Sequence, residues 1–285
     1  MRVTLWGTRG SLAAPGPETA RYGGNTACVE VVGREGAVLV LDAGTGIRRL
    51  SLSLSKSLRR VDILLTHLHM DHIQGLGFFG PLRNPQAEVH IWGPASTTLG
   101  LRSRLTRYLS PPLFPVHLRD LPCALFLHEV PCDDFQIGEF RIASCLVCHP
   151  DPTVGYRITS GGMALTYLPD HEPALGARKF PLSPDWTSGW ALAKSAHLLI
   201  HDAQYTDAEY ADRVGWGHSS FEHAFRFAVL AQVKSFVPFH HDPSHTDDDL
   251  DRLIAQAIAT AKPSFTVMPG TEGATFNLLN PETIP

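Results

Sequence analysis

The sequence has no hydrophobic run long enough to cross a membrane and no strong excess of positive charge. Its apolar stretches fall well short of the 18 or more residues that a transmembrane helix requires. The formal net charge of -4 over 285 residues lacks the basic balance typical of proteins that coat nucleic acids. We therefore expect no membrane association and no nucleic-acid partner. A small anionic ligand remains compatible with this charge, because bound metal ions can supply local positive charge.

Cysteine is also sparse, and no export signal is recognisable. Five cysteines are an odd number and make a poor disulfide framework. Residues 1–7 lack the apolar segment of a secretory signal, so we expect a cytoplasmic protein. Cys145-Leu-Val-Cys148-His149 matches the haem attachment motif of c-type cytochromes. That chemistry belongs to exported proteins, and residues 140–147 instead predict a strand that ends near His149, so we disfavour haem.

Short strands and later helices organise the chain. Short β-branched and apolar runs bounded by turns predict strands at 3–6, 27–32, 37–42, 60–66, 88–92, 140–147, 154–158, 163–168, 198–200 and 236–239. Capping-box patterns at Ser219 to Glu222 and Thr246 to Asp249 predict helices over 221–232 and 250–261. The proline-rich stretch 110–115 predicts a surface loop. With no repeat or linker visible, we expect one layered α/β domain over residues 1–285.

Four potential metal ligands follow the strand predicted at 60–66, within six residues: His67, His69, Asp71 and His72. Strand alternation places residues i and i+2 on the same side, so His67 and His69 can grip one ion. The chain then presents Asp71 and His72 to a neighbouring position. Imidazole and carboxylate together suit zinc, manganese or iron better than calcium. The segment therefore predicts a transition-metal site.

This H-x-H-x-D-H segment resembles the signature of the metallo-β-lactamase superfamily, whose fold is an αββα sandwich. The resemblance implies three further ligands in order, each after a predicted strand: His149, Asp170 and His240. It also implies two divalent metal ions, with zinc favoured over manganese or iron. The implied groups are His67, His69 and His149 for one ion, Asp71, His72 and His240 for the other, and Asp170 between them. His241 is an alternative to its neighbour, but His240 directly follows the apolar strand.

Asp42 resembles the first aspartate of the family, which orients a ligand imidazole through its other ring nitrogen. A buried aspartate that caps the glycine-rich turn 43–46 is an alternative reading, and both can hold together. The glycine-containing segments 7–11 and 21–26 are also similar to those of the phosphodiesterase branches. Their glycines favour tight turns at the edge of the cleft.

Two segments resemble motifs of RNase Z. Leu198–Tyr205 is similar to its His-Glu-Ala-Thr motif, with Asp202 in the position of the glutamate, and residues 217–220 resemble its His-Ser-Thr motif. The resemblance implies that His218 contacts the scissile phosphate or protonates the leaving oxygen, and that Asp202 orients it. Asp71 is the third candidate catalytic residue. The alternative is a solvent-exposed His218 near a helix start.

These resemblances predict a hydrolase of phosphodiester bonds whose substrate is a small cyclic nucleotide or cyclic phosphate, as in the phosphoribosyl cyclic phosphodiesterases. RNase Z itself is a less favoured alternative. That family carries a tRNA-gripping arm between the ligands that match His149 and Asp170, whereas only 21 positions separate these two residues here. A glyoxalase II-type thioesterase is disfavoured, because that class carries a C-terminal helical domain and only 45 residues follow His240 here. A true β-lactamase lacks the bridging aspartate. A non-catalytic metal-binding member is the remaining alternative, and a homodimer is the assembly that the resemblance suggests.

Overall fold

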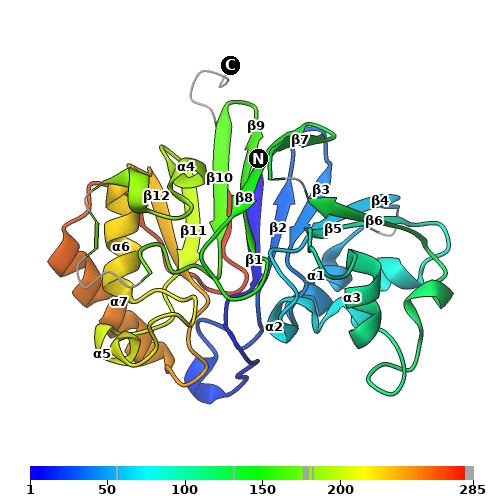
Figure 1. The fold of residues 1–285 in the computed structure, drawn as a ribbon, viewed down its shortest axis with the longest axis horizontal. Helices are drawn as coiled ribbons and strands as arrows, with labels where there is room; N and C mark the ends of the chain where they lie inside the picture. The colour runs from blue at the N-terminus through cyan, green and yellow to red at the C-terminus, as the bar shows by residue number, and fades with distance from the viewer. Residues whose placement is uncertain (56, 131, 176–179, 182, 280–285) are drawn as a thin grey trace.

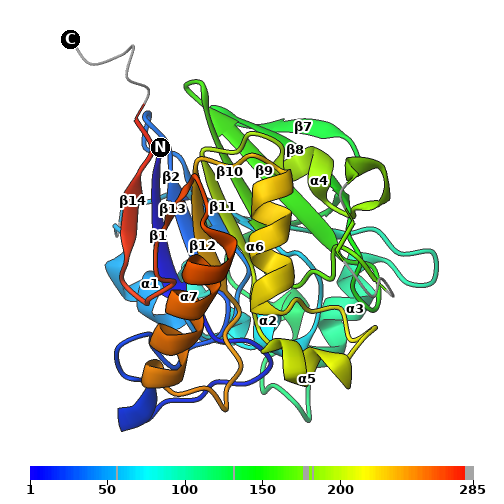
Figure 2. The same cartoon turned by 90° about the vertical axis from the view of Figure 1, so that its left-hand side faces the viewer.

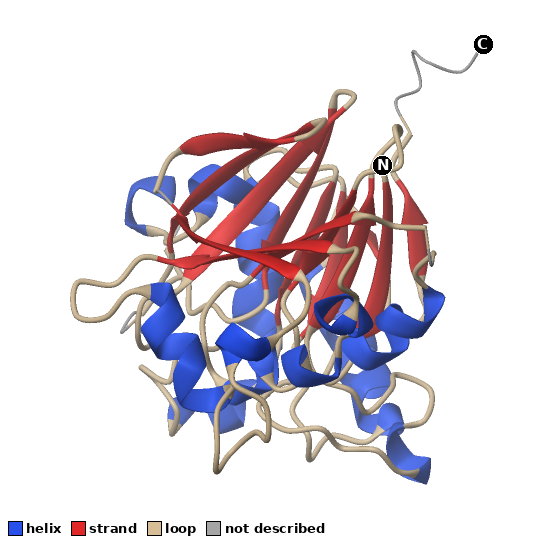
Figure 3. Ribbon diagram, turned by 90° about the vertical axis from the view of Figure 1, so that its right-hand side faces the viewer, coloured by secondary structure: helices blue, strands red, loops and turns tan. Residues whose placement is uncertain are grey.

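Two β-sheets pack face to face between two outer layers of helices. The computed structural model describes residues 1–279 except 56, 131, 176–179 and 182. In Figure 1, α6 and α7 cover one outer face and α1 and α3 the other, with both sheets between them. Figures 2 and 3 show the same layers from the two sides. This arrangement confirms the predicted αββα sandwich. None of the described helices combines the length and apolarity needed to traverse a bilayer.

The first sheet holds seven strands among the described residues, in the spatial order β14-β1-β2-β3-β4-β5-β6. Strands β3 to β6 run parallel, and the pairs that β1 makes with β14 and β2, and β2 with β3, are antiparallel. The strand bounds are β1 Arg2–Gly7, β2 Cys28–Val32, β3 Val38–Leu41, β4 Arg60–Leu64, β5 Glu88–Pro94, β6 Ala124–Val130 and β14 Thr275–Asn277.

The second described sheet also has seven strands, in the order β13-β12-β11-β10-β9-β8-β7. Its strand bounds are β7 Asp134–Ile137, β8 Phe140–Leu146, β9 Val154–Ser160, β10 Met163–Leu168, β11 Leu198–Asp202, β12 Ser235–Phe239 and β13 Thr266–Val267. The α-helices are α1 Ile47–Ser53, α2 Met70–Ile73, α3 Leu101–Tyr108, α4 Trp190–Ala193, α5 Asp207–Ala211, α6 Phe221–Leu230 and α7 Asp247–Ala261. Short 3-10 turns connect several of these elements.

Three apolar layers hold the sandwich together. Alternate residues of both sheets, such as Val29 and Val31 of β2 and Tyr156 and Ile158 of β9, meet in the core between the sheets. A second cluster packs the other face of the second sheet against α6 and α7, and a third packs the first sheet against α1 and α3. Because the central strands are covered on both faces, their sequences are nearly continuous apolar runs.

The strand directions bring the predicted site residues to one edge of the sandwich. Strands β10, β11 and β12 are parallel, and β8 runs in the same direction because it and β10 are both antiparallel to β9. Strands β3 and β4 are likewise parallel to each other. The segments that follow these strands carry Asp42, His67, His149, Asp170 and His240. A ligand site at the carboxyl ends of strands is the arrangement expected for such sheets.

Two helix starts were predicted with different success. Helix α7 begins after the Thr246 capping box, whose hydroxyl accepts the N–H of Asp249, as predicted. Helix α6 begins at Phe221, also as predicted, but the predicted capping box was wrong. The N-cap is Ser220, whose hydroxyl accepts the N–H of His223. The Ser219 hydroxyl instead donates to the carbonyl oxygen of His171, which leaves the cap to its neighbour.

Candidate metal centre

Two groups of side chains at the edge of the sandwich each present metal-ligating atoms. In the first group, His67, His69 and His149 offer one atom each within 4.8 Å of one another. His69 Nδ1 and His149 Nε2 are 3.3 Å apart. The His69 side chain is 42% exposed, so this group opens to solvent.

The second group is buried and contains Asp71, His72, Asp170 and His240, again with ligand atoms within 4.8 Å. The Nε2 atoms of His72 and His240 are 3.3 Å apart. Both also lie close to Asp71 Oδ2, at 3.2 and 3.1 Å. These are the residues that the sequence assigned to a second ion.

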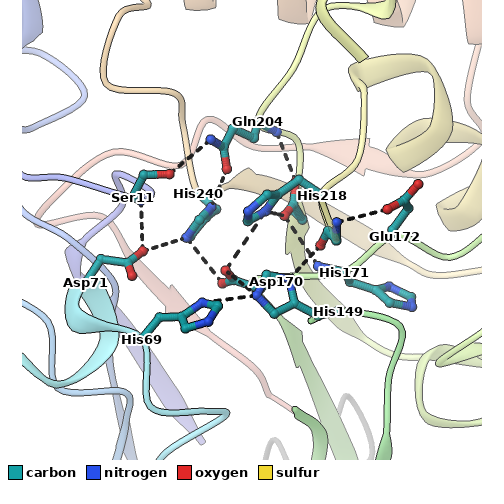
Figure 4. A network of polar contacts seen from close by, with 12 residues as sticks. Ser11, His69, Asp71, His149, Asp170, His171, Glu172, Gln204, His218 and His240 are labelled. Atoms are coloured by element: carbon teal, nitrogen blue, oxygen red, sulfur yellow. Dashed lines mark hydrogen bonds and ion pairs between the residues drawn. The ribbon is translucent and has the colours of Figure 1, made fainter. Parts of the chain in front are cut away.

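Asp170 lies between the two groups. Its Oδ2 atom is 3.8 Å from Nε2 of His67 and 3.8 Å from Nε2 of His149. Its Oδ1 atom faces the second group, at 2.9 Å from His72 Nε2 and 3.2 Å from His240 Nε2. Figure 4 shows Asp170 at the centre of the network, with His69 and His149 on one side and His240 and Asp71 on the other. One carboxylate can therefore serve both groups.

Hydrogen bonds on the far side of the imidazoles orient the ring nitrogens toward the groups. His72 Nδ1 donates to Asp42 Oδ2 at 2.8 Å, His149 Nδ1 to the carbonyl oxygen of Gly217 at 2.9 Å, and His240 Nδ1 to Gln204 Oε1 at 2.9 Å. With a proton on Nδ1, each neutral ring leaves the Nε2 lone pair for a metal ion.

Asp42 orients a ligand imidazole, as the resemblance implied, and its carboxylate bonds residues outside the glycine-rich turn 43–46 rather than capping that turn. Besides His72, its carboxylate accepts the backbone N–H of Thr66 at 2.8 Å and the hydroxyl of Tyr167 at 2.9 Å. It is fully buried and has a φ of 56°. It thus fixes the start of the H-x-H-x-D-H segment and orients an imidazole of the second group.

The donor set fits divalent transition-metal ions. His67 Nε2 is buried and, among the described residues, has no hydrogen-bond partner. Such groups are costly unless a ligand satisfies them. Burial opposes the charged form of Asp170, but the imidazoles of His240, His72 and His67 hold its pKa well below the usual range. Imidazole nitrogens converging on carboxylate oxygens suit zinc, manganese or iron.

The structure settles the geometry of the neighbouring pair His240 and His241. His240 lies in the second group, whereas His241 Nε2 donates to the carbonyl oxygen of Gly270 at 3.0 Å. Burial lowers the pKa of His241 to about 3, so this ring is neutral. The C-x-x-C-H pattern is divided between two environments. Its His149 belongs to the first ligand group, and its Cys145 packs on the face of the second sheet that the helices cover.

Next to the two groups lies the pair formed by His218 and Asp202. Asp202 ends β11, is fully buried, and accepts His218 Nδ1 at 2.7 Å and the N–H of Ser219 at 3.0 Å. His218 Nδ1 is also 3.9 Å from Asp170 Oδ2. Burial disfavours protonated His218, but the Asp202 carboxylate outweighs that effect and raises the pKa of His218 to about 9. His218 is buried at 8% exposure, which disagrees with the solvent-exposed alternative.

Sequence reasoning missed Glu172, a fully buried carboxylate that organises the loop before His218. It accepts the Tyr210 hydroxyl at 2.7 Å, the N–H of Gly215 at 3.0 Å and the N–H of Gly217 at 2.9 Å. Gly217 in turn supplies the carbonyl oxygen that orients His149. Glu172 follows Asp170 by two residues, and no local pattern marks it, because its partners come from a later part of the chain.

Gln204 and Ser11, in the glycine-containing segment 7–11, make contacts with the ligand groups that the sequence did not predict. Gln204 Nε2 donates to Ser11 Oγ at 3.1 Å, and the N–H of Ser11 donates to Asp71 Oδ2 at 2.8 Å. A Cβ atom on Gly10 would lie 2.2 Å from His240 Nδ1. The predicted turn therefore passes against the His240 ring, and only glycine fits there.

A two-sheet sandwich with histidines and aspartates gathered at its edge defines the metallo-β-lactamase class of fold. Residues 38–241, more than half of the chain, match the family model described as the beta-lactamase superfamily domain. The chain belongs to this superfamily.

Two relatives and two solved structures illustrate where the chain stands within it. Ribonuclease Z of Thermococcus gammatolerans is 26% identical over 257 residues, covering 75% of this chain and 78% of that protein. Ribonuclease Z of Natronomonas pharaonis is 29% identical over 265 residues, covering 92% and 80%. The short form of human tRNase Z superposes with a TM-score of 0.67 at 22% identity, covering 98% and 100%. A diphosphatase from the PhnP family gives 0.67 at 17% identity, covering 97% of each chain. These two structures share the fold.

Proposed function

We propose that this protein is a metal-dependent hydrolase of phosphodiester bonds, with a small cyclic nucleotide or cyclic phosphate as its substrate. The observation that carries the proposal is the His218–Asp202 pair, 2.7 Å apart, directly beside the carboxylate shared by the two ligand groups. A proton donor next to a divalent metal site is what cleavage of a phosphate ester requires. The ribonuclease Z relatives support phosphodiester chemistry.

In this proposal, His67, His69 and His149 would hold one ion, Asp71, His72 and His240 would hold the other, and Asp170 could serve both groups. Zinc is the favoured metal, with manganese or iron as alternatives. When bound, such ions lower the pKa of water and neutralise developing charge on phosphoryl oxygens. The chain itself supplies the proton for the leaving oxygen from His218, which Asp202 holds in its protonated form. Asp71 has no separate catalytic role in this proposal beyond binding the metal.

The preference for a small substrate rests on the segment between His149 and Asp170. Strands β9 and β10 pair as an antiparallel hairpin through Ser160 and Met163, with Gly161 and Gly162 at the turn. That hairpin accounts for most of the segment and leaves no inserted arm of the kind that grips tRNA. The net charge of -4 also favours a small substrate over a nucleic acid. RNase Z activity is the second candidate, since the relatives named above are ribonucleases Z.

A substrate panel on metal-reconstituted protein tests the proposal. The panel holds a chromogenic phosphodiester, 2′,3′- and 3′,5′-cyclic nucleotides, a phosphoribosyl cyclic phosphate, precursor tRNA, a thioester and a β-lactam. We expect hydrolysis of the chromogenic diester and of at least one cyclic phosphate. Cleavage of precursor tRNA alone would replace the small substrate with the RNase Z alternative. Thioester hydrolysis alone, or two bound ions without any turnover, would overturn phosphodiesterase activity.

The matched variant is His218→Ala. Loss of a general acid lowers kcat by roughly 10²- to 10⁴-fold, while the two ligand groups remain complete. We therefore expect low turnover with wild-type metal content, measured by elemental analysis. Loss of metal from this variant would give His218 a structural role.

A further inference from the structure

Two cysteines lie near the open end of the β7–β8 hairpin, Cys145 within β8 and Cys132 in the bend that precedes β7. The strands pair Asp134 with Ala143 and Phe135 with Ile142 in antiparallel register. The N–H of Ser144 donates to the carbonyl oxygen of Asp133 at 3.3 Å, which continues the register by one step. Extending this register by one further residue would set Cys132 opposite Cys145, and an electrostatic interaction between the two thiols places them near each other.

The type of pairing determines how close the two cysteines come. Asp133 and Ser144 are a hydrogen-bonded pair, so the pairs on either side are non-hydrogen-bonded. Residues in such a pair have Cα atoms about 4.5 Å apart and side chains on the same face of the sheet. A disulfide requires a Cα separation of about 4.4–6.8 Å. The register of this hairpin, extended to the two cysteines, would therefore bring them within the range of a bridge.

The environments of the two thiols agree with this placement. Cys132 is exposed, Cys145 is half-buried, and both are free thiols. Burial raises the pKa of Cys145 to about 11, and the nearby Cys132 thiol adds to that shift, as expected for close neighbours. The other cysteines are placed differently. Cys28 and Cys123 are buried. Cys148 lies beyond the end of β8, where its N–H is bonded to Ser188 Oγ at 2.9 Å.

We propose that Cys132 and Cys145 are a redox modification site that closes to an intramolecular disulfide. The oxidant is a low-molecular-weight disulfide such as oxidised glutathione. The exposed Cys132 thiolate attacks it, a mixed disulfide forms, and one small thiolate leaves. Cys145 then loses its proton to solvent and attacks the Cys132 sulfur, which releases the second small thiol. Two electrons pass from the cysteines to the oxidant, which ends as two thiols. The site is independent of the phosphodiesterase proposal.

Thiol counting and peptide mapping of the full, metal-loaded protein test the site. Protein is equilibrated with reduced or oxidised glutathione, quenched in acid, unfolded and alkylated, and its intact mass is measured. We expect five labels on the reduced protein and 5 − 2 = 3 on the oxidised protein. Mapping should show a Cys132–Cys145 crosslink that dithiothreitol removes.

Single variants separate this pair from other pairings. The exposed Cys132→Ser and the half-buried Cys145→Ser should each form no intramolecular crosslink. The control Cys148→Ser should still form the Cys132–Cys145 bridge. Five labels after oxidation, a Cys145–Cys148 crosslink, or glutathione retained on Cys132 without closure would each overturn the proposal.

Discussion

At the scale of single residues, burial and the nature of the hydrogen-bond partner give two histidines near the site opposite pKa shifts. A carboxylate raises the pKa of His218, whereas burial lowers the pKa of His241. Both residues are neighbours of His240, the first in space and the second in sequence. The difference is Asp202, which contacts the first ring, while the second ring meets a backbone carbonyl. Asp202 is thus the carboxylate that contributes most to the raised pKa of His218, with smaller contributions from Asp170 and Asp71.

Replacing Asp202 with asparagine tests this dependence. A proton donor is active below its pKa and inactive above it, so turnover by the wild type should fall as the pH rises through the pKa of His218. Asp202→Asn removes the negative charge, lowers that pKa, and should move the alkaline limb of the kcat profile to lower pH. The pH profiles of both proteins provide the measurement. Superimposable alkaline limbs would show that Asp202 does not control the proton on His218.

Removing the shared carboxylate should affect both ions. In Asp170→Ala we expect metal content to fall from about two ions per chain to below one, because neither group keeps its full charge. Elemental analysis after dialysis gives the content. Asp151→Ala is the control, because it removes a carboxylate that is close to the site but belongs to neither ligand group. That carboxylate is 79% exposed and lies 3.7 Å from His69 Nε2. Retention of two ions in Asp170→Ala would place the bridge elsewhere.

At the scale of elements, the loop between α5 and α6 is held by one buried acid from another part of the chain. Glu172 accepts two N–H donors of this loop and the hydroxyl of Tyr210 in α5, and the loop carries His218 and the carbonyl oxygen that orients His149. Its position explains how a loop that contains Gly215 and Gly217 can hold His218 in a defined place. Hydrogen bonds to a charged group contribute about 1.5–3 kcal/mol each.

Glu172→Gln should loosen both functions of the loop. We expect metal affinity at the first group to fall by about 10- to 100-fold, the usual effect of disturbing a residue that orients a ligand, together with a lower kcat. Competition with a chelator measures the affinity. Tyr210→Phe, which removes one donor and leaves both glycine contacts, should have the smaller effect. Wild-type metal affinity in Glu172→Gln would show that Glu172 does not orient the first ligand group.

Some elements were predictable and others were not. The strands that deliver the ligands are apolar runs followed by a polar residue, and all of them were expected from the sequence. Strands β6, β7, β13 and β14 and helices α1 to α5 were not predicted, and helix α7 begins three residues earlier than the predicted 250. Helix α1 has only two buried side chains, Ile47 and Leu50. Strand β6 lies at the sheet edge and is mostly half-exposed, so its burial pattern has no clean period. Short peripheral elements depend on their packing partners more than on local pattern.

At the scale of the whole molecule, the site joins the two sheets. His67, His69, Asp71 and His72 follow β4 of the first sheet, and the remaining ligands follow β8, β10 and β12 of the second. Bound ions would therefore crosslink the two halves of the sandwich. Without cations, buried nitrogen and oxygen atoms face one another with few compensating donors.

Metal removal should consequently lower global stability. Ligands that bind only the folded state at 1,000 times their Kd stabilise it by about 4 kcal/mol. For a chain of this size, that corresponds to a shift in Tm on the order of 10 °C. Calorimetry of chelated and reconstituted protein measures the shift. An unchanged Tm after verified metal loss would show that the sandwich does not depend on the ions.

The sequence alone determined the kind of site and most of its members. H-x-H-x-D-H after an apolar strand predicts a metal site, and the family resemblance implied the further ligands His149, Asp170 and His240 after later strands. Only the tertiary structure decided which oxygen of Asp170 faces which group, that His240 and not His241 enters the cluster, and which partners Glu172 and Gln204 have. Those contacts join residues from different elements, and they depend on register, twist and loop path, which no local pattern encodes.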